Sequence, residues 1–93
     1  MATLHIEHKI TDYTTWRSAF DAFAQARHSA GVTAERVAQP VDDPEYIVVG
    51  LDFAAPDHAA AFLQFLEQHV WSTPSNSPGL AGSPRTMILT PST

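Results

Sequence analysis

Polar and apolar positions alternate along the first ten residues of the chain. One face of this stretch carries Leu4, Ile6, His8 and Ile10, and the other carries Thr3, His5, Glu7 and Lys9. A period of two is typical of a β-strand that buries one of its faces. The pattern predicts a strand over residues 3–10, in which His8 lies among apolar neighbours on the buried side.

The period then changes to that of a helix. Asp12 is a good N-cap residue, and Gly31 is suited to end the helix that follows it. Between them the inward-facing positions recur at helical spacing: Tyr13, Trp16, Ala19, Phe20, Phe23, Ala26, Arg27 and Ala30. These positions predict one continuous helix.

The rest of the chain predicts two strands, a helix, a loop and a last strand. Residues 32–39 have a weak strand pattern, and the prolines and aspartates of residues 40–44 favour a turn. Residues 45–53 are apolar or small on both faces, as in a central strand covered on both sides. A second helix starts at Pro56 and buries Ala59, Phe62, Leu63, Leu66 and Val70. Residues 72–84 predict a long loop, and residues 86–90 predict the last strand.

The element order βαββαβ predicts an α+β fold with a ferredoxin-like antiparallel sheet. Right-handed crossovers place both helices on one face of that sheet. A chain of 93 residues is enough for one core, so we expect residues 1–93 to form a single domain. The predicted central strand over residues 45–53 is apolar or small on both faces, although the helices cover only one face of the sheet. We therefore expect a homodimer in which the open sheet faces of two copies pack together, a dimeric α+β barrel.

Composition narrows the classes of partner. Charged residues make up 16% of the chain, against about 25% in a typical soluble domain, which fits a surface covered by another copy. The net charge of −5 and the five Lys plus Arg argue against nucleic acid or a membrane surface as a partner. The lack of cysteine excludes disulfides and cysteine-ligated zinc. With no long apolar run and no signal-like N-terminus, we expect a cytoplasmic protein.

Several short motifs extend over nearly the whole chain. They are HKITDY at residues 8–13 with Trp16 and the FD pair at 20–21, DDP at 42–44, the helix residues 59–63, WSTPSNSP at 71–78 and GSP at 82–84. The set resembles the dimeric α+β barrel superfamily, which includes antibiotic-biosynthesis-monooxygenase-like and polyketide-cyclase-like small proteins. The resemblance implies the fold and the homodimer. It also implies a small-molecule site, but this superfamily has many activities and the resemblance assigns none of them.

His8 is the residue that we expect to act as a catalytic acid or base. Burial beside Trp16 and Phe20 would lower the pKa of its imidazole and keep the ring neutral, in the form that can accept a substrate proton. The alternative is a core histidine that hydrogen-bonds a backbone carbonyl.

Four aromatic residues are expected to bind substrate: Trp16, Phe20, Phe62 and Trp71. The two indoles can form the walls of a slot for a flat aromatic ligand, with phenylalanines behind them. The alternative for Trp16 is plain core packing. Trp71 ends a helix before the long loop, so it is the better pocket or lid residue. The loop itself is either a lid over a pocket or an arm that packs on the partner subunit.

Other polar residues give weaker hypotheses. His5 and Glu7 share a strand face and could approach one metal ion, but no third ligand is identifiable, so we expect no metal site. Arg27 and Arg36 could hold a substrate carboxylate, although an arginine that extends its head to solvent is commoner. No nucleophile elbow and no phosphate-binding glycine motif is present.

These features leave three functional hypotheses. The first is an enzyme without metal, flavin or other cofactor, a monooxygenase or cyclase-like protein that acts on a small aromatic or polyketide-like compound. The second is a ligand-binding or accessory dimer without activity. The third is a structural dimer whose pocket is filled by its own side chains. A cavity smaller than about 300 Å³ would leave no room for a drug-sized ligand.

Overall fold

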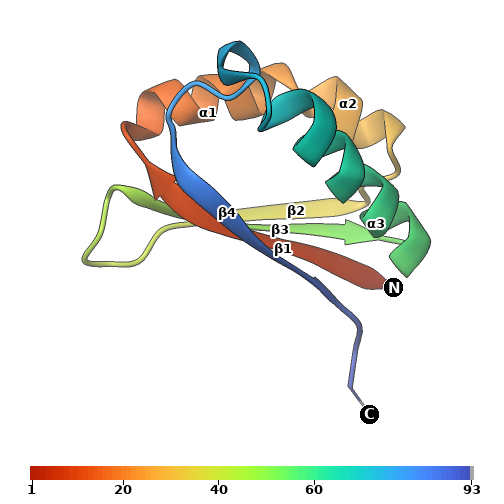
Figure 1. Cartoon of the computed structure of the whole chain (residues 1–93). Coiled ribbons are helices and arrows are strands. Elements are labelled where there is room, and N and C mark those ends of the chain that lie inside the picture. Colours follow the sequence, from red (N-terminus) through yellow and green to blue (C-terminus); the bar gives the residue numbers. More distant parts are fainter. Residues whose placement is uncertain (93) are drawn as a thin grey trace.

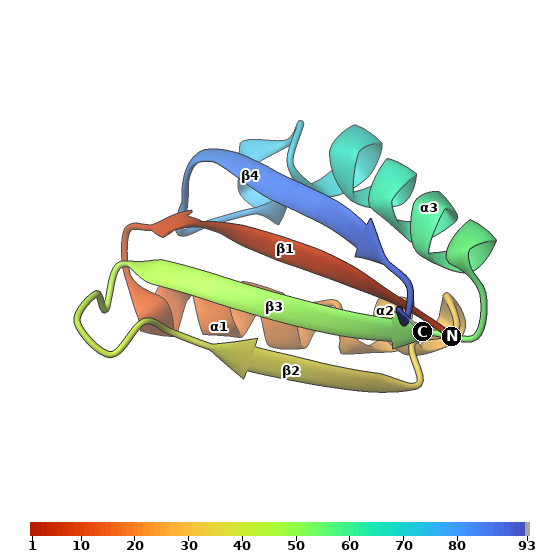
Figure 2. The same cartoon turned by 90° about the horizontal axis from the view of Figure 1, so that it is seen from below.

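The computed structural model describes residues 1–92 and has one four-stranded antiparallel sheet with all helices on one face (Figure 1). The strand order is β2-β3-β1-β4, as the view onto the open face shows (Figure 2). The strands are β1 (Ala2–Ile10), β2 (Ala34–Ala38), β3 (Tyr46–Phe53) and β4 (Leu80–Leu89). The helices are α1 (Tyr13–Ala22), α2 (Ala24–Ser29) and α3 (Pro56–Phe65), followed by a π-helical turn (Leu66–Val70) and a 3₁₀ turn (Pro74–Asn76). The ferredoxin-like α+β fold predicted from the sequence is confirmed.

The core lies between the central strands and the helices. β1 pairs with both β3 and β4, so it is a central strand of the sheet. Its even-numbered side chains are buried on the face that the helices cover. The side chains of Leu4, Leu51 and Phe53 are fully buried there, and Phe62 of α3 packs onto them. The period of two in the first ten residues therefore identified the buried face of β1 correctly, His8 included.

The predicted continuous helix between Asp12 and Ala30 is wrong, because the helix breaks at Phe23. Asp12 caps α1 as expected, since its side chain accepts a hydrogen bond from the Thr15 backbone N–H at 2.9 Å. The carbonyl of Phe20 accepts hydrogen bonds from the Phe23 backbone N–H and from the Arg27 guanidinium. Because the Phe20 carbonyl accepts these two hydrogen bonds, the regular i→i+4 bonding of the helix is interrupted at this point. The chain turns at Phe23, and α2 begins at Ala24.

The predicted loop over residues 72–84 is too long, and the predicted last strand over residues 86–90 starts too late. β4 begins at Leu80, and its pairing with β1 is interrupted by a bulge in which residues 82–84 lie opposite His8. Pro84 has no backbone N–H to give to a ladder, so it is tolerated at a bulge. The glycine and proline residues of this stretch predict a loop from the sequence, whereas in the structure they lie in an irregular strand.

The second helix departs from its prediction at its C-terminal end. Regular helix stops at Phe65, and the next turn closes with a bond from the Trp71 backbone N–H to the Leu66 carbonyl at 2.8 Å. Bonds of this i→i+5 type widen the helix and change the direction in which later side chains point. A pattern of 3.6 residues per turn gives no sign of such a turn.

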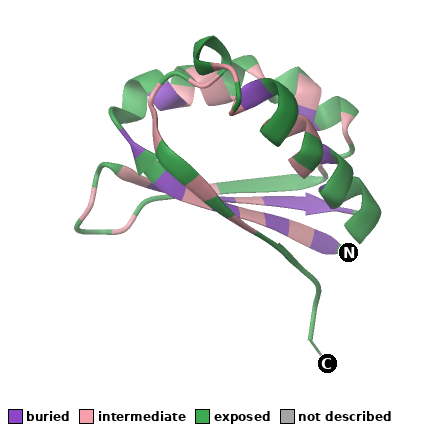
Figure 3. Ribbon diagram, in the orientation of Figure 1, coloured by how far each residue is buried: buried purple, intermediate pink, exposed green. Residues whose placement is uncertain are grey.

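The two inner strands carry mostly half-buried side chains on the open face of the sheet, several of them polar, and buried and half-buried residues alternate along most of β1 (Figure 3). The Tyr46 hydroxyl donates to Glu7 at 2.9 Å, and Glu7 also bonds His5 at 2.8 Å. Arg36 forms two hydrogen bonds with Asp52, at 3.0 and 2.9 Å. The expectation of a uniformly dry central strand is thus too simple, and the packing of this face on a second copy stays a prediction. Within residues 1–92, no helix is long and apolar enough to cross a membrane.

Candidate functional site

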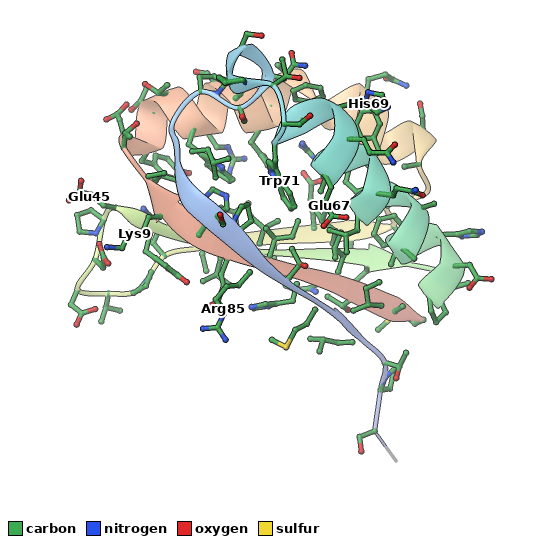
Figure 4. All side chains as sticks on the ribbon, viewed as in Figure 1. Lys9, Glu45, Glu67, His69, Trp71 and Arg85 are labelled. Carbon is green, nitrogen blue, oxygen red and sulfur yellow. The ribbon has the colours of Figure 1, made fainter. Side chains whose placement is uncertain are left out.

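A cavity of about 80 Å³ lies between the sheet and the helices. Its walls come from β1, β3, α1, α3 and the segment after α3. All five site residues predicted from the sequence line it: His8, Trp16, Phe20, Phe62 and Trp71. Figure 4 shows Trp71 on the inner side of the helix layer, whereas Arg85 lies on the opposite face of the sheet. The fold therefore brings the predicted residues together, and their roles in binding or catalysis stay predictions.

The His8 imidazole has one ring nitrogen fixed and the other available. Nδ1 lies 2.8 Å from the Lys9 carbonyl, and because a carbonyl can only accept, Nδ1 carries the proton. Desolvation lowers the pKa of His8 below its ordinary value, more than the backbone hydrogen bond raises it. The ring is therefore neutral near pH 7, and Nε2 carries a lone pair.

The second ring nitrogen of His8, Nε2, has no hydrogen-bond partner among residues 1–92. Because no fully buried side-chain nitrogen or oxygen atom in this part of the chain lacks a partner, Nε2 is not fully buried. The His8 residue as a whole lines the cavity. The bond to the Lys9 carbonyl agrees with the alternative of a core histidine, and the role of His8 as an acid or base stays a prediction.

An aromatic ladder forms one wall of the cavity. The ring centroids of His8 and Trp16 are 6.3 Å apart, and those of Trp16 and Phe20 are 4.9 Å apart with nearly parallel planes. The Arg27 guanidinium carbon lies 3.6 Å from the centroid of the Phe20 ring. The His8 and Trp16 planes are inclined by 59°, whereas Trp16, Phe20 and Arg27 stack on one another, so the wall is a stack of groups that runs from a neutral base to a cation.

Arg27 also forms part of the cavity wall, whereas the sequence indicates it only as a candidate partner of a substrate carboxylate. It is 4% exposed, its Nε donates to Glu35 at 2.7 Å, and it also lines the cavity. Charged side chains are almost never this buried unless they are paired. Arg36 differs, because it lies on the open sheet face and bonds Asp52 there. Both arginines have carboxylate partners within the chain, which replaces the interpretation that they extend freely into solvent.

Residues 72–79, here called the cover segment, close one side of the cavity. The Asn76 side chain donates to the His69 carbonyl at 2.8 Å, and the Thr11 backbone N–H donates to the Gly79 carbonyl at 2.8 Å. Gly79 has φ +86°, and a Cβ placed on it would lie 2.9 Å from the Trp16 backbone nitrogen. The cover segment is therefore pinned to α1 and to the end of α3. Of the two interpretations of the long loop, this arrangement favours the lid.

Two polar lining residues, Asn76 and Ser77, belong to the loop predicted as a lid or an arm and are not among the site residues predicted from the sequence. The only signal for them was their place in a polar stretch directly after Trp71. His5 and Glu7, considered as metal ligands, point to the open face and bond each other. Within residues 1–92 no group of three or more His, Cys, Asp or Glu is placed to hold a metal ion.

Comparisons with known proteins find the fold but no close relative. No family model matches the chain, and no curated protein matches it. A protein of Agrobacterium tumefaciens superposes with a TM-score of 0.66 at 12% identity, covering 99% of this chain and 94% of that one. A dimeric ferredoxin-like protein from an uncultured marine organism gives a TM-score of 0.61 at 10% identity, covering 99% and 97%.

A third structure carries a functional name. It is a Nitrosomonas europaea protein provisionally named as an antibiotic biosynthesis monooxygenase, with a TM-score of 0.61 at 16% identity and 98% of both chains covered. Identities this low establish a shared fold and leave activity open. The chain therefore has the ferredoxin-like α+β fold found in antibiotic-biosynthesis-monooxygenase-like and dimeric ferredoxin-like proteins, as the sequence resemblance implied.

Proposed function

We propose that this protein binds a small aromatic compound with an acidic O–H group and acts on it by transferring that proton to Nε2 of His8. The observation that carries the proposal is that His8 lines the cavity while its Nδ1 is bound to the Lys9 carbonyl, which leaves Nε2 without a partner within residues 1–92. A base held in this way must be within hydrogen-bond reach of the proton that it removes.

The surroundings of His8 suit the product of that proton transfer. A phenolate or enolate is an anion, and the Arg27 guanidinium lines the same cavity. The ion pair with Glu35 at 2.7 Å holds Arg27 at the cavity wall, where the cation can interact with that anion. Trp16 and Phe20 supply apolar aromatic surface beside His8 for the ring of the ligand.

An electron-rich anion can react with dioxygen directly, which supports a monooxygenase activity like that in the name of the Nitrosomonas protein. In such a reaction a phenol and O₂ give a quinone and water. The substrate loses four electrons, one oxygen atom enters the ring, and the other leaves as water. His8 takes the phenolic proton in the first step and returns it to the departing oxygen, and the hydrogen of the ring carbon that gains the oxygen leaves as the second proton of the water. This balance needs no further reductant.

The proposal is tested with phenol and toluene, which have similar shapes but differ in the O–H group. Nitrogen-15 NMR of the His8 ring reports its tautomer and its hydrogen bonds. We expect phenol to shift the Nε2 resonance while Nδ1 stays protonated, and toluene to leave Nε2 unchanged. Equal responses to both compounds would mean an apolar pocket without a base.

Two variants separate the functions of the His8 ring atoms. His8→Asn keeps an amide donor near the position of Nδ1 and removes Nε2, so we expect it to fold but to lose the preference for phenol. His8→Gln places an amide oxygen near the position of Nε2, which can accept a hydrogen bond but not the proton. It should retain phenol binding and lose conversion of phenolic substrates under O₂. Conversion by His8→Gln at the wild-type rate would show that His8 is not the base, and no conversion by the wild-type protein would leave only the non-catalytic, ligand-binding function.

We also propose that the protein is a homodimer that pairs its open sheet faces. Met87 and Leu89 of β4 lie on that face, opposite His5 and Thr3, and their side chains are 53% and 44% exposed. Large apolar side chains at this exposure favour a partner surface, and one of the structural neighbours is described as dimeric. In sedimentation experiments at micromolar concentration, Met87→Glu should be monomeric and the fully exposed control Val41→Glu dimeric. A wild-type monomer of 10.1 kDa would overturn this part of the proposal.

A further inference from the structure

We infer that the ligand has two parts: an aromatic head in the cavity beside His8, and an uncharged, oxygen-bearing chain that lies in a separate groove between α1 and the cover segment. This inference rests on the proposed function, because it takes the head to be the acidic aromatic group that His8 recognises.

The size of the cavity is the first reason. Pockets that hold a whole drug-sized ligand begin at about 300 Å³, whereas the cavity beside His8 has about 80 Å³. The enclosed space can accept a small aromatic group but not the whole of a drug-sized ligand. A larger ligand must therefore leave the cavity through one of its walls.

The second reason is a groove that adjoins the cavity. It has about 610 Å³, is open to solvent, and lies between α1 and residues 75–78 of the cover segment. Four residues line both hollows: Ala19, Phe23, Asn76 and Pro78. These shared residues lie between the two hollows, so we place the link between head and chain at this boundary, between α1 and the 3₁₀ turn.

The lining of the groove indicates the chemistry of that chain. Thr14, Ser18 and Ser75 line it, and none of their hydroxyls has a hydrogen-bond partner within residues 1–92. None of the groove-lining residues is charged. Hydroxyl groups donate and accept without selecting for charge, so the groove suits a hydroxyl, ether, ester or amide chain, and not an acid or an amine.

The chain contains no cysteine, so an introduced thiol is a unique probe of the groove. Ser18→Cys places a thiol in the groove, and Ala24→Cys places a control thiol on the exposed side of α2, outside both hollows. The probes are phenol and a phenol with a para-hydroxyalkyl chain. The measurement is the rate at which a maleimide modifies each thiol.

We expect the hydroxyalkyl phenol to slow labelling of Ser18→Cys about tenfold at a concentration of ten times its Kd, since occupied protein is then about ten times as abundant as free protein. Phenol at the same occupancy should leave the rate unchanged, and Ala24→Cys should react equally in all samples. The hydroxyl end of the chain should also bind about fivefold more tightly than a methyl end of the same length, and the double variant Thr14→Val/Ser18→Ala should abolish that difference.

The outcomes separate this inference from the proposed function. If both probes shift the His8 Nε2 resonance but neither protects the Ser18→Cys thiol, the head site exists and the groove is not part of it. If phenol alone protects the thiol, ligands bind in the groove and the two-part arrangement is wrong. If neither probe shifts Nε2, the proposed function fails, and this inference fails with it.

Discussion

The contact between Gly79 and α1 gives a prediction that can be worked through quantitatively. Gly79 and Gly82 both have positive φ angles, +86° and +73°. A Cβ at Gly79 would lie 2.9 Å from the Trp16 backbone nitrogen, whereas a Cβ at Gly82 would have no atom within 4 Å. The two alanine variants therefore share the backbone strain and differ in the steric contact.

The expected magnitudes follow from those two terms. An L-residue in the left-handed region costs about 1–2 kcal/mol, and the lower entropy of the unfolded chain with alanine returns about 0.4–1 kcal/mol. Gly82→Ala should thus lose about 1 kcal/mol of unfolding free energy. Gly79→Ala adds an overpacking cost of about 1–3 kcal/mol, because the contacted atom is backbone and cannot turn away. We expect it to lose about 2–4 kcal/mol.

Urea unfolding followed by tryptophan fluorescence measures both variants on one scale. Trp16 and Trp71 line the cavity that the cover segment closes, so Gly79→Ala should also change the native fluorescence, and Gly82→Ala should not. Phenol affinity should fall for Gly79→Ala alone. Unfolding free energies that agree within about 0.5 kcal/mol would refute the close approach of the cover segment to α1.

Three further predictions concern buried or paired charges. The pKa of His8 is lowered in the folded protein, so the unfolded chain binds a proton more readily and the unfolding free energy should fall as the pH drops below 6.5. Between pH 7.5 and 5.5, His8→Asn should lose less unfolding free energy than the wild type. Equal losses would contradict a buried neutral imidazole. Arg36 and Thr3 hold the pKa of Asp52 at about 2, below its ordinary 3.8, so this pair stabilises the fold above pH 4 and ceases to do so as the pH falls towards 2. Asp52→Asn should cost about 1 kcal/mol at pH 7, because Arg36 is largely exposed, and should remove that part of the acid dependence in denaturation curves. Glu35→Gln should lower the unfolding free energy by about 1–2 kcal/mol, since Arg27 would remain buried without its carboxylate partner. The double variant Glu35→Gln/Arg27→Met should recover most of that loss, which a double-mutant cycle measures.

The sequence by itself determined the order of the main elements and the buried face of β1. Alternation over residues 3–10 placed His8 on the helix-covered side, and Asp12 and Gly31 set the ends of the first helical region. These features are local, because capping and side-chain alternation depend on neighbours a few residues apart. The same periodicity located Trp16, Phe20 and Phe62 on one buried layer, which is why the predicted site residues line one cavity.

Only the tertiary structure decided how that cavity is built. The break at Phe23 depends on a side chain from the next turn, the π-helical turn depends on where Trp71 packs, and the bulge opposite His8 depends on the register of β4 against β1. Each of these is a competition between a local preference and a contact made elsewhere in the fold. The volume of the cavity and the partner of Arg27 also depend on such contacts. Sequence patterns report the local preference alone, so they placed the residues of the site but not the space between them.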